Sequence, residues 1–576
     1  MIGLIAATDA GATGCRRLAA AWPQERVRVY DGPVRESLQR AFAECDRLVC
    51  FLATGAVVRL VAPLLRDKAQ DPGIVCVDEA HRHAVALLGG HAGGANDLAA
   101  RVADALPGCT PVITTATDAA DVPGLDTLGW PATGDVAAVS RAVLDGRPVT
   151  AYTDAVWPLP AFPENVAFEK APEDGPADGN PVLWFTDRDI PRRDTDTAVV
   201  HTPSLTVGVG ASRGAPAQEI LTLIEETLAQ ARLDPRSVTA LATVEAKAGE
   251  PGLLEAAARL GVPLRTHPSG SLAAIAVPNP SDAPLAAVGT PSVAEAAALA
   301  EAGPGAELVV PKRKSAPAGR PAMATCAVAR RRPRGRLAVV GLGPGARDLL
   351  TPRARAELRR ASVVVGLDQY VDQIRDLLRP GTRVLESGLG AEEERARTAV
   401  AEARAGHAVA LIGSGDAGVY AMASPALAAA SADIDVVGVP GVTAALAAAA
   451  LLGAPLGHDH VSVSLSDLHT PWEVIERRVR AAASADLVVT FYNPRSRGRD
   501  WQLPSALKLL SEHRAPTTPV GVVRNASRPD ESVRVTTLAA LDPATVDMMT
   551  VVTVGNTATR LVAGRMVTPR GYRWQR

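Results

Sequence analysis

The chain has 576 residues, which corresponds to about four domains at roughly 150 residues each. Its 60 lysines and arginines nearly balance 62 aspartates and glutamates, for a formal net charge of −2 at pH 7. That balance excludes the overall basic excess typical of nucleic-acid-binding proteins. Hydrophobic residues make up 47% and aromatic residues only 3%, so we expect globular domains with cores of Ala, Val and Leu and few rings for stacking on bases.

The six cysteines are scattered without a Cys-x-x-Cys pair, so no metal site is predicted and reduced thiols are expected. The opening MIGLIAAT predicts a strand rather than a signal peptide. The most apolar stretch lies between Pro440 and Pro455 and is dominated by alanine, which favours a buried helix over a membrane span. These features predict a cytoplasmic protein with no membrane partner and no nucleic-acid partner.

Residues 1–136 alternate short apolar runs with segments of helical spacing, the pattern of an open α/β sheet. The runs that predict strands are IGLIAAT, DRLVCFLA, GIVCVD and PVITTAT. His81 and His83, with Asp78 and His91, have metal-ligand chemistry. The segment DEAHR is more typical of an exposed hairpin turn, which we favour over a metal site.

Residues 137–203 are rich in Pro, Asp and Gly and are predicted to form a small, loop-rich connecting region. A second α/β domain is predicted over 204–330, with amphipathic helices in APAQEILTLIEETLAQARL and GEPGLLEAAARLG. Residues 331–336, in the basic run RRRPRGR, are predicted to be a solvated linker rather than a nucleic-acid patch.

A third unit is predicted over 337–576, with lobes at about 337–442 and 443–576. Its first strand ends in GLGPGA, which satisfies the dinucleotide form G-x-G-x-x-A and leaves an NAD-dependent dehydrogenase as an alternative function. In that fingerprint the helix opens directly from the glycines. Here the helix start signal, Thr351 followed by Pro352, comes several residues later, and Pro344 removes a loop N–H donor.

Two further small-residue loops follow predicted strands, GSGDAGVY at 413–420 and VPGVTA at 439–444. Ligands bind at the carboxyl ends of parallel strands, so three such loops would line one crevice with exposed backbone. That arrangement suits a flat, polar cofactor held by main-chain groups.

The motifs G-x-G-P-G, G-S-G-D-A-G-V-Y and V-P-G-V-T-A, in this order, resemble the tetrapyrrole (corrin/porphyrin) methyltransferases that use S-adenosylmethionine. The later segments SLSDLHTPW, FYNPRSRGR, RNASRPDE and TVGNT are similar to the branch of precorrin-3B C-17 methyltransferases in cobalamin biosynthesis. The resemblance implies a two-lobed tetrapyrrole methylase fold and S-adenosylmethionine as cofactor. It implies cofactor contacts at Pro344, Ser414, Gly415, Asp416, Val419, Thr443, Ala444, Asn493 and Ala526.

The substrate of such an enzyme carries many carboxylates, for which a rim of arginines is the expected counterpart. The arginines predicted to contact it are Arg495, Arg497, Arg524 and Arg528, with Arg499 beside them; solvated surface arginines are the alternative. Asp467 is the candidate acid/base or substrate-orienting group for ring contraction, or else the N-cap of the following helix.

In the first half, GGHAGGAND, PVITTATD, VGVGASRG, EAKAGEPGLLE, VGTPSVAEAAAL and VPKRKSA resemble the cobalt-precorrin-5A hydrolase family, which opens the lactone left by ring contraction. The resemblance itself assigns no catalytic residue here. On chemical grounds, His91 is the best candidate general base, with Asn96 or backbone N–H groups stabilising an oxyanion. Similar proteins have Cys-Arg-Arg where this chain has Ala211-Ser212-Arg213. A non-catalytic corrin-binding module is therefore the alternative for this half.

The overall prediction is an α/β protein of several open-sheet domains that joins a lactone hydrolase to a C-17 methyltransferase. Its partners are predicted to be precorrin or cobalt-precorrin substrates and a second copy of the chain, in a homodimer formed through the methyltransferase half.

Overall fold

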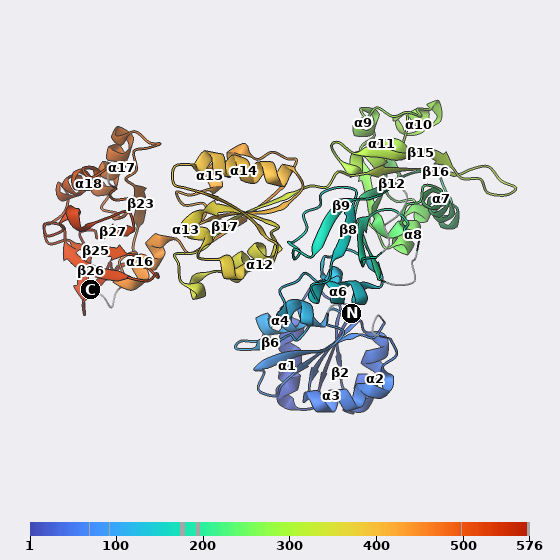
Figure 1. The fold of residues 1–576 in the computed structure, drawn as a ribbon, viewed down its shortest axis with the longest axis horizontal. Helices are drawn as coiled ribbons and strands as arrows, with labels where there is room; N and C mark the ends of the chain where they lie inside the picture. Colours follow the sequence, from blue (N-terminus) through green and yellow to red (C-terminus); the bar gives the residue numbers. More distant parts are fainter. Residues whose placement is uncertain (68–69, 91–92, 173–178, 192–195, 497, 573–576) are drawn as a thin grey trace. The chain divides into compact units, whose positions relative to one another are not determined.

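The computed structural model describes residues 1–67, 70–90, 93–172, 179–191, 196–496 and 498–572. The chain forms two compact units (Figure 1). Unit 1 comprises residues 1–155, 162–333 and 379–381, and unit 2 comprises 156–161, 334–378 and 382–576. The α/β fold expected from the sequence is confirmed, whereas the finer domain bounds stay a prediction.

The first sheet of unit 1 has the strand order β2-β1-β3-β4-β5-β6. Its strands are β1 (Ile2–Ala6), β2 (Val27–Tyr30), β3 (Arg47–Phe51), β4 (Gly73–Val77), β5 (His83–Leu88) and β6 (Thr110–Val112). Side chains of α1 (Asp9–Ala21) and α4 (Ala95–Ala105) join one core cluster, and those of α2 (Val34–Glu44) and α3 (Thr54–Val61) join another. Helices thus cover both faces, as in an open α/β sheet.

The interval 137–203 is more regular than its composition predicts. It contributes most of a five-stranded sheet of order β7-β11-β10-β8-β9. The strands are β7 (Ala132–Gly134), β8 (Val149–Thr153), β9 (Val166–Lys170), β10 (Val182–Thr186) and β11 (Thr197–His201), and α6 (Val136–Leu144) lies beside them. The runs VLWFT and TAVVH are buried throughout. This burial stabilises strands despite the Pro- and Gly-rich sequence between them, which favours loops.

The third sheet of unit 1 has the order β14-β13-β12-β16-β15. Its strands are β12 (Leu205–Ala211), β13 (Val238–Val244), β14 (Leu264–His267), β15 (Glu307–Lys314) and β16 (Ala324–Arg330). The predicted helices form as α7 (Ala217–Gln230) and α8 (Pro251–Leu260), and α11 (Ala294–Ala302) packs on β12. Gly208 permits this close packing, because a Cβ there would lie 1.9 Å from the carbonyl oxygen of Ala294.

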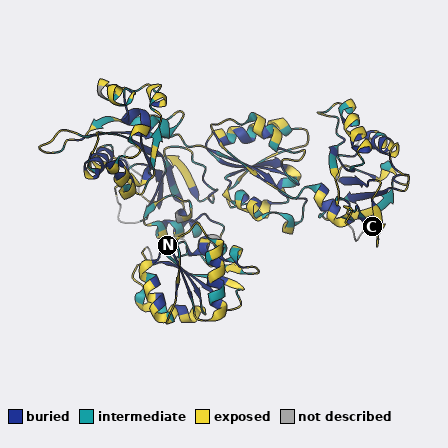
Figure 2. Ribbon diagram, turned by 180° about the vertical axis from the view of Figure 1, so that it is seen from behind, coloured by how far each residue is buried: buried dark blue, intermediate teal, exposed yellow. Residues whose placement is uncertain are grey.

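The first lobe of unit 2 is a parallel sheet of order β19-β18-β20-β17-β21. Its strands are β17 (Arg336–Gly341), β18 (Val363–Leu367), β19 (Arg383–Ser387), β20 (Ala408–Gly413) and β21 (Asp435–Val439). Alternate strand residues pack against α14 (Glu392–Arg404) and α15 (Ala423–Ala429) on one face and α12 (Pro352–Arg360) and α13 (Asp368–Val371) on the other. Figure 2 shows these buried strands between helices with exposed outer faces.

The predicted start of α12 is confirmed. Thr351 caps the helix by accepting a hydrogen bond from the Ala354 N–H at 3.1 Å, and Pro352 is its first residue. A short 3₁₀ helix, Arg347–Leu349, separates it from the glycines. The helix therefore does not open at the glycine loop, and the geometry of a dinucleotide pyrophosphate site is not formed there.

The second lobe of unit 2 is a sheet of order β23-β24-β27-β25-β26. Its strands are β23 (His460–Ser464), β24 (Val488–Tyr492), β25 (Pro519–Arg524), β26 (Ser532–Thr537) and β27 (Thr550–Val554). Side chains of α17 (Trp472–Ser484) and α18 (Gln502–Ser511) join one core cluster, and α16 (Ala444–Leu452) joins another. A small sheet of β22 (Gly453–Ala454), β29 (Arg565–Val567) and β28 (Arg560–Val562) completes the lobe.

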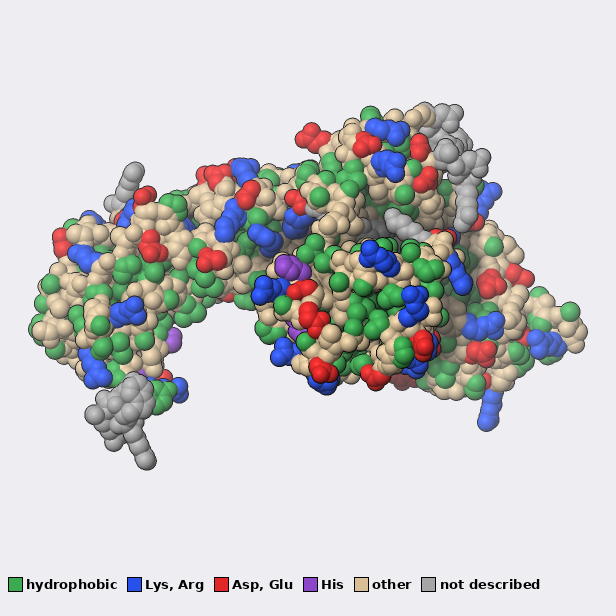
Figure 3. Space-filling view, turned by 90° about the horizontal axis from the view of Figure 1, so that it is seen from below, with side chains coloured by type: hydrophobic (Ala, Val, Ile, Leu, Met, Phe, Trp, Pro, Cys, Tyr) green, Lys and Arg blue, Asp and Glu red, His purple; other side chains and the backbone are tan. Residues whose placement is uncertain are grey.

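The alanine-rich stretch forms α16, with Ala448 and Leu452 buried, as expected. Among the helices that the structure describes, none is both long and apolar enough to cross a membrane. Lysines and arginines are interspersed with aspartates and glutamates over the face shown in Figure 3.

Candidate functional site

Three glycines from three different loops meet at the carboxyl ends of β20, β17 and β21, which are neighbouring strands of the first lobe. Gly343 and Gly415 exchange backbone hydrogen bonds of 3.0 and 2.7 Å. A Cβ on Gly441 would lie 2.1 Å from the carbonyl oxygen of Gly415 and 2.8 Å from that of Gly341. The three loops can approach this closely only because these positions carry no side chain.

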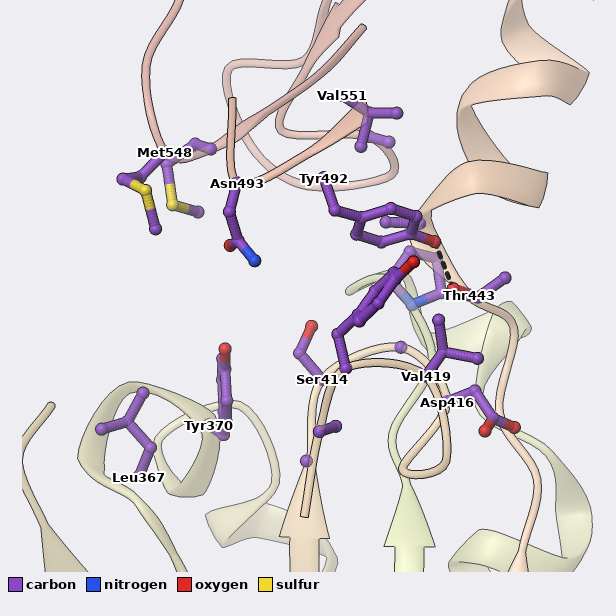
Figure 4. A pocket seen from close by; sticks show the side chains of 18 of the residues that line it. Leu367, Tyr370, Ser414, Asp416, Val419, Thr443, Tyr492, Asn493, Met548 and Val551 are labelled. Carbon is purple, nitrogen blue, oxygen red and sulfur yellow. Dashed lines mark hydrogen bonds between the residues drawn. The ribbon is translucent and has the colours of Figure 1, made fainter. Parts of the chain in front are cut away.

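A cavity of about 280 Å³ lies over these loops and is lined by residues of both lobes (Figure 4). Its volume lies near the lower end of the range for small-molecule pockets, roughly 300 to 1,000 Å³. All nine residues predicted to contact a cofactor line it: Pro344, Ser414, Gly415, Asp416, Val419, Thr443, Ala444, Asn493 and Ala526. The structure thus brings these residues together, while their role as ligands stays a prediction.

The carboxylate of Asp416 is engaged with the loop backbone. One oxygen accepts from the Gly418 N–H at 2.8 Å and the other from the Gly441 N–H at 3.0 Å. The side chain therefore ties the second loop to the third. A contact with the ammonium or ribose of a ligand would have to share these oxygens.

Two tyrosines that the sequence motifs did not predict as site residues, Tyr420 and Tyr492, also line the cavity. The Tyr492 hydroxyl accepts from the Ala445 N–H at 2.8 Å and is hydrogen-bonded to Thr443, so it caps α16. The Tyr420 hydroxyl donates to the carbonyl of Ser462 at 2.7 Å, which joins the two lobes. The centroids of the two rings lie 5.3 Å apart.

The predicted substrate arginines that the structure describes have different partners. Arg528 lines the cavity and donates to the carbonyl of Pro344 at 2.6 Å and to Ser414 Oγ at 2.7 Å. Arg524 is paired with Asp547 at 2.7 Å, and this hydrogen bond raises the pKa of its guanidinium. Arg495 donates to the carbonyl of Ala544 at 2.6 Å.

The remaining arginines of the predicted rim are Arg497 and Arg499. Arg497 lies outside the described residues. Arg499 donates to the carbonyl of Asn493 at 2.5 Å and to the sulfur of Met548 at 3.3 Å, so it adjoins the cavity wall. Burial lowers the pKa of Arg499, an effect that the charge of Asp467 opposes.

Asp467 lies in the loop after β23 and does not line the cavity. Its carboxylate accepts a hydrogen bond from Gln502 Nε2 at 2.9 Å. The alternative that Asp467 caps a helix is wrong, because α17 begins at Trp472 after Pro471 and has no side-chain cap. The carboxylate therefore does not cap a helix, and its negative charge acts on Arg499 by raising the pKa of that guanidinium.

Comparisons with known proteins match three segments of the chain. Residues 336–542 match the family described as tetrapyrrole (corrin/porphyrin) methylases. Residues 36–118 match the N-terminal model of cobalamin synthesis G, and 205–329 match its C-terminal model. A probable cobalt-factor III C(17)-methyltransferase of Salmonella typhimurium is 47% identical over 239 residues, which cover 41% of this chain and 99% of that relative. The chain belongs to the tetrapyrrole methylases.

Other relatives agree with this assignment of unit 2, the methylase unit. A precorrin-3B C(17)-methyltransferase of a Sinorhizobium species is 41% identical, with 41% of this chain and 97% of that protein covered. The solved structure of the methyltransferase CobJ is 40% identical and covers 41% of this chain and 100% of that chain, with a TM-score of 0.40. The chain spans about half the length of several other curated relatives, 45% of one and 48% of another. The comparisons give no support to a dehydrogenase.

In unit 1, the predicted catalytic His91 lies outside the described residues. Asn96 is buried at the start of α4, and its side-chain amide donates to Thr115 Oγ1 at 3.1 Å. The hairpin turn expected for DEAHR is confirmed, since Asp78 accepts from the backbone N–H of Arg82 and His83 between antiparallel β4 and β5. No group of potential metal ligands is found among the residues that the structure describes.

Residues at one end of the methylase cavity had no motif to mark them. Tyr370 follows β18, and Glu392 and Arg395 lie in the first turn of α14. In the sequence, Arg395 stands in the charged run EEER, which is typical of a solvated helix face. Only the packing of α14 on the sheet shows that this arginine is buried.

Proposed function

We propose that the methylase unit transfers a methyl group from S-adenosylmethionine to carbon 17 of precorrin-3B or its cobalt form, with ring contraction. The observation that carries this proposal is the cavity over the three-glycine junction, which gathers all nine predicted cofactor contacts. The names of the relatives, cobalt-factor III and precorrin-3B C(17)-methyltransferases, support the substrate.

The residues of the cavity fit the cofactor. S-adenosylmethionine supplies an electrophilic methyl group on a sulfonium, so the transfer needs alignment and exclusion of water more than covalent help. The glycine loops offer backbone groups at close range, because a Cβ at Gly441 would fill the space that they share. Val419 and Ala526 give the wall apolar surface.

Mass spectrometry of the product tests this function. Purified protein is incubated with S-adenosylmethionine and precorrin-3B or cobalt-factor III, and we expect the tetrapyrrole to gain one methyl group with release of S-adenosylhomocysteine. Comparison of the two tetrapyrroles decides between the metal-free and the cobalt substrate. A chain that methylates neither would contradict the proposal.

Asp467 is proposed to act as the acid/base or substrate-orienting group of ring contraction. Gln502 fixes one carboxylate oxygen and leaves the other available. We expect Asp467→Asn to lower kcat by about 100-fold, the usual contribution of a general acid or base, and to leave the Kd for S-adenosylhomocysteine unchanged because Asp467 lies outside the cavity lining. A variant with wild-type kcat would remove Asp467 from the mechanism.

For unit 1 we propose hydrolytic opening of the cobalt-precorrin-5A lactone, with a non-catalytic corrin-binding module as the alternative. The matches to both cobalamin synthesis G domains support it. The full chain, given cobalt-precorrin-5A without S-adenosylmethionine, is expected to release acetaldehyde. If the chain binds the corrin but releases no acetaldehyde, unit 1 is the non-catalytic corrin-binding module.

We further propose a cytoplasmic location and a homodimer formed through the methylase unit. Light scattering of the purified chain measures the second of these directly, with twice the chain mass of 59.6 kDa as the expected result.

A further inference from the structure

One end of the methylase cavity lies away from the predicted cofactor contacts. It is formed at the carboxyl ends of β18 and β19 by Leu367, Tyr370, Leu389, Glu392 and Arg395, here called the Arg395 end. In Figure 4, Leu367 and Tyr370 lie on one side of the cavity, Asp416, Val419 and Thr443 on the other, and Ser414 between them. The proposed cofactor site therefore leaves the Arg395 end for another group.

Arg395 is a buried cation held by neutral partners. Its side chain is almost wholly buried, with 5% of the residue exposed. The guanidinium donates to Ser387 Oγ at 2.9 Å, to the carbonyl of Gly388 at 2.8 Å and to the sulfur of Met422 at 3.6 Å. Within the described part of the chain, no carboxylate lies within the 4.0 Å of an ion pair with it. A buried charge without a counter-ion is costly, which points to an anion supplied from outside the protein.

Two neighbouring groups, Arg528 and Tyr370, favour an anion at this end, and the charge of one lining carboxylate, Glu392, opposes it. Arg528 also lines the cavity, and its guanidinium donates to the neutral oxygens of Pro344 and Ser414. Burial raises the pKa of Tyr370 despite the opposing charges of Arg528 and Arg395, so its hydroxyl stays protonated at neutral pH and can donate a hydrogen bond. The carboxylate of Glu392 accepts from the Gly390 N–H at 3.3 Å.

We propose that the Arg395 end binds a carboxylate side chain of the tetrapyrrole, with Arg395 as the main cation and Arg528 and Tyr370 beside it. The inference rests on the proposed function of the cavity and adds the residue that orients the acceptor. Charge-assisted hydrogen bonds to a guanidinium are strong and directional. Fixing one peripheral carboxylate would therefore fix which edge of the macrocycle faces the methyl donor.

The test uses the full chain and three probes. Uroporphyrin III represents a polycarboxylate tetrapyrrole, S-adenosylhomocysteine carries the cofactor carboxylate, and 5′-methylthioadenosine lacks that carboxylate. Binding is measured for the wild type, Arg395→Gln, Arg395→Lys and the control Arg397→Gln. Arg397 lies on the same helix, with 70% of its side chain exposed.

We expect Arg395→Gln to weaken uroporphyrin III binding about tenfold, which corresponds to about 1.4 kcal/mol, and to leave both adenosine ligands unchanged. Arg395→Lys keeps the charge and is expected to recover most of the affinity. Arg397→Gln is expected to match the wild type.

Three results would overturn the inference. An equal loss of affinity for all three probes would mean that Arg395 only supports the Ser387–Gly388 loop structurally. Weakening of S-adenosylhomocysteine alone would show that the carboxylate bound is that of the cofactor. Unchanged binding of every probe would leave Arg395 no ligand role. A wild-type chain that binds neither adenosine ligand would instead contradict the proposed function, so the two failures are distinguishable.

Discussion

Gly441→Ala is expected to weaken S-adenosylhomocysteine binding by about 100-fold. The new Cβ would lie 2.1 Å from the carbonyl oxygen of Gly415 and 2.8 Å from two atoms of Gly341. All of these are backbone atoms, so the loops must separate and the cavity floor must change shape. Overpacking of this kind costs about 1–3 kcal/mol, and 1.4 kcal/mol is a factor of ten in affinity. Isothermal titration calorimetry of the full chain measures the effect.

Gly438→Ala is the matched control for this variant. Gly438 lies in the same strand-loop segment, at the exposed side of β21, and a Cβ there would meet no atom within 4 Å. Wild-type affinity is expected for this control. If Gly441→Ala also bound S-adenosylhomocysteine normally, the three-glycine junction would not be the cofactor floor.

Glu295→Ala is expected to lower the free energy of unfolding of unit 1 by about 3 kcal/mol. Glu295 is fully buried in the first turn of α11. Its carboxylate accepts from the backbone N–H and side-chain amide of Asn279, at 3.1 and 2.8 Å, and from the Lys312 N–H at 2.9 Å. Removal takes the acceptor from these three part-buried donors, and a hydrogen bond of this kind contributes about 1 kcal/mol.

Scanning calorimetry of the full chain measures this loss. S-adenosylhomocysteine should raise the unfolding temperature of the methylase unit only, so the transition that does not shift belongs to unit 1. The exposed Glu225 of α7 provides the control Glu225→Ala, for which no change is expected. An unchanged unit 1 transition in Glu295→Ala would mean that water replaces the lost acceptors.

The same carboxylate predicts acid sensitivity of unit 1. Burial raises the pKa of Glu295, but hydrogen bonds from Asn279 and Lys312 outweigh this and the pKa lies below its ordinary value of 4.5. A carboxyl group whose pKa is lower in the folded state than in the unfolded state stabilises the fold. This stabilisation is complete above the unfolded-state pKa and is lost as the pH falls through the folded-state pKa. We therefore expect the stability of unit 1 to decline below about pH 4, and to decline less steeply in Glu295→Gln.

Local signals in the sequence predicted the elements around the methylase site well. The start of α12 is defined by the Thr351 side-chain cap and by Pro352, whose missing N–H costs nothing at a first helical position. Both are local properties of the sequence. The three small-residue loops follow buried strands, and the parallel order of those strands brings their ends together. The family motifs supplied nine predicted cofactor contacts, and the structure gathers all nine in one cavity.

Side-chain partners could not be predicted in this way. Arg524 is the last residue of β25 and Arg528 follows four residues later, yet Arg524 pairs with Asp547 and Arg528 reaches the loops of the first lobe. Such choices depend on residues far away in the chain. The expected loops of 137–203 are another case, because the burial of β10 and β11 in a sheet outweighs local composition.

The sequence alone established the α/β class, the family of the second half and the three small-residue loops that follow its strands. Periodicity, helix caps and glycine positions are local properties of the sequence. Only the tertiary structure decided which charges are neutralised and which are not. Arg395 is the clearest instance: its neighbours in sequence are glutamates of an exposed helix turn, but packing buries its guanidinium against neutral acceptors. Burial and counter-ions are properties of the assembled fold, since they depend on atoms that meet only when the sheet and helices pack together.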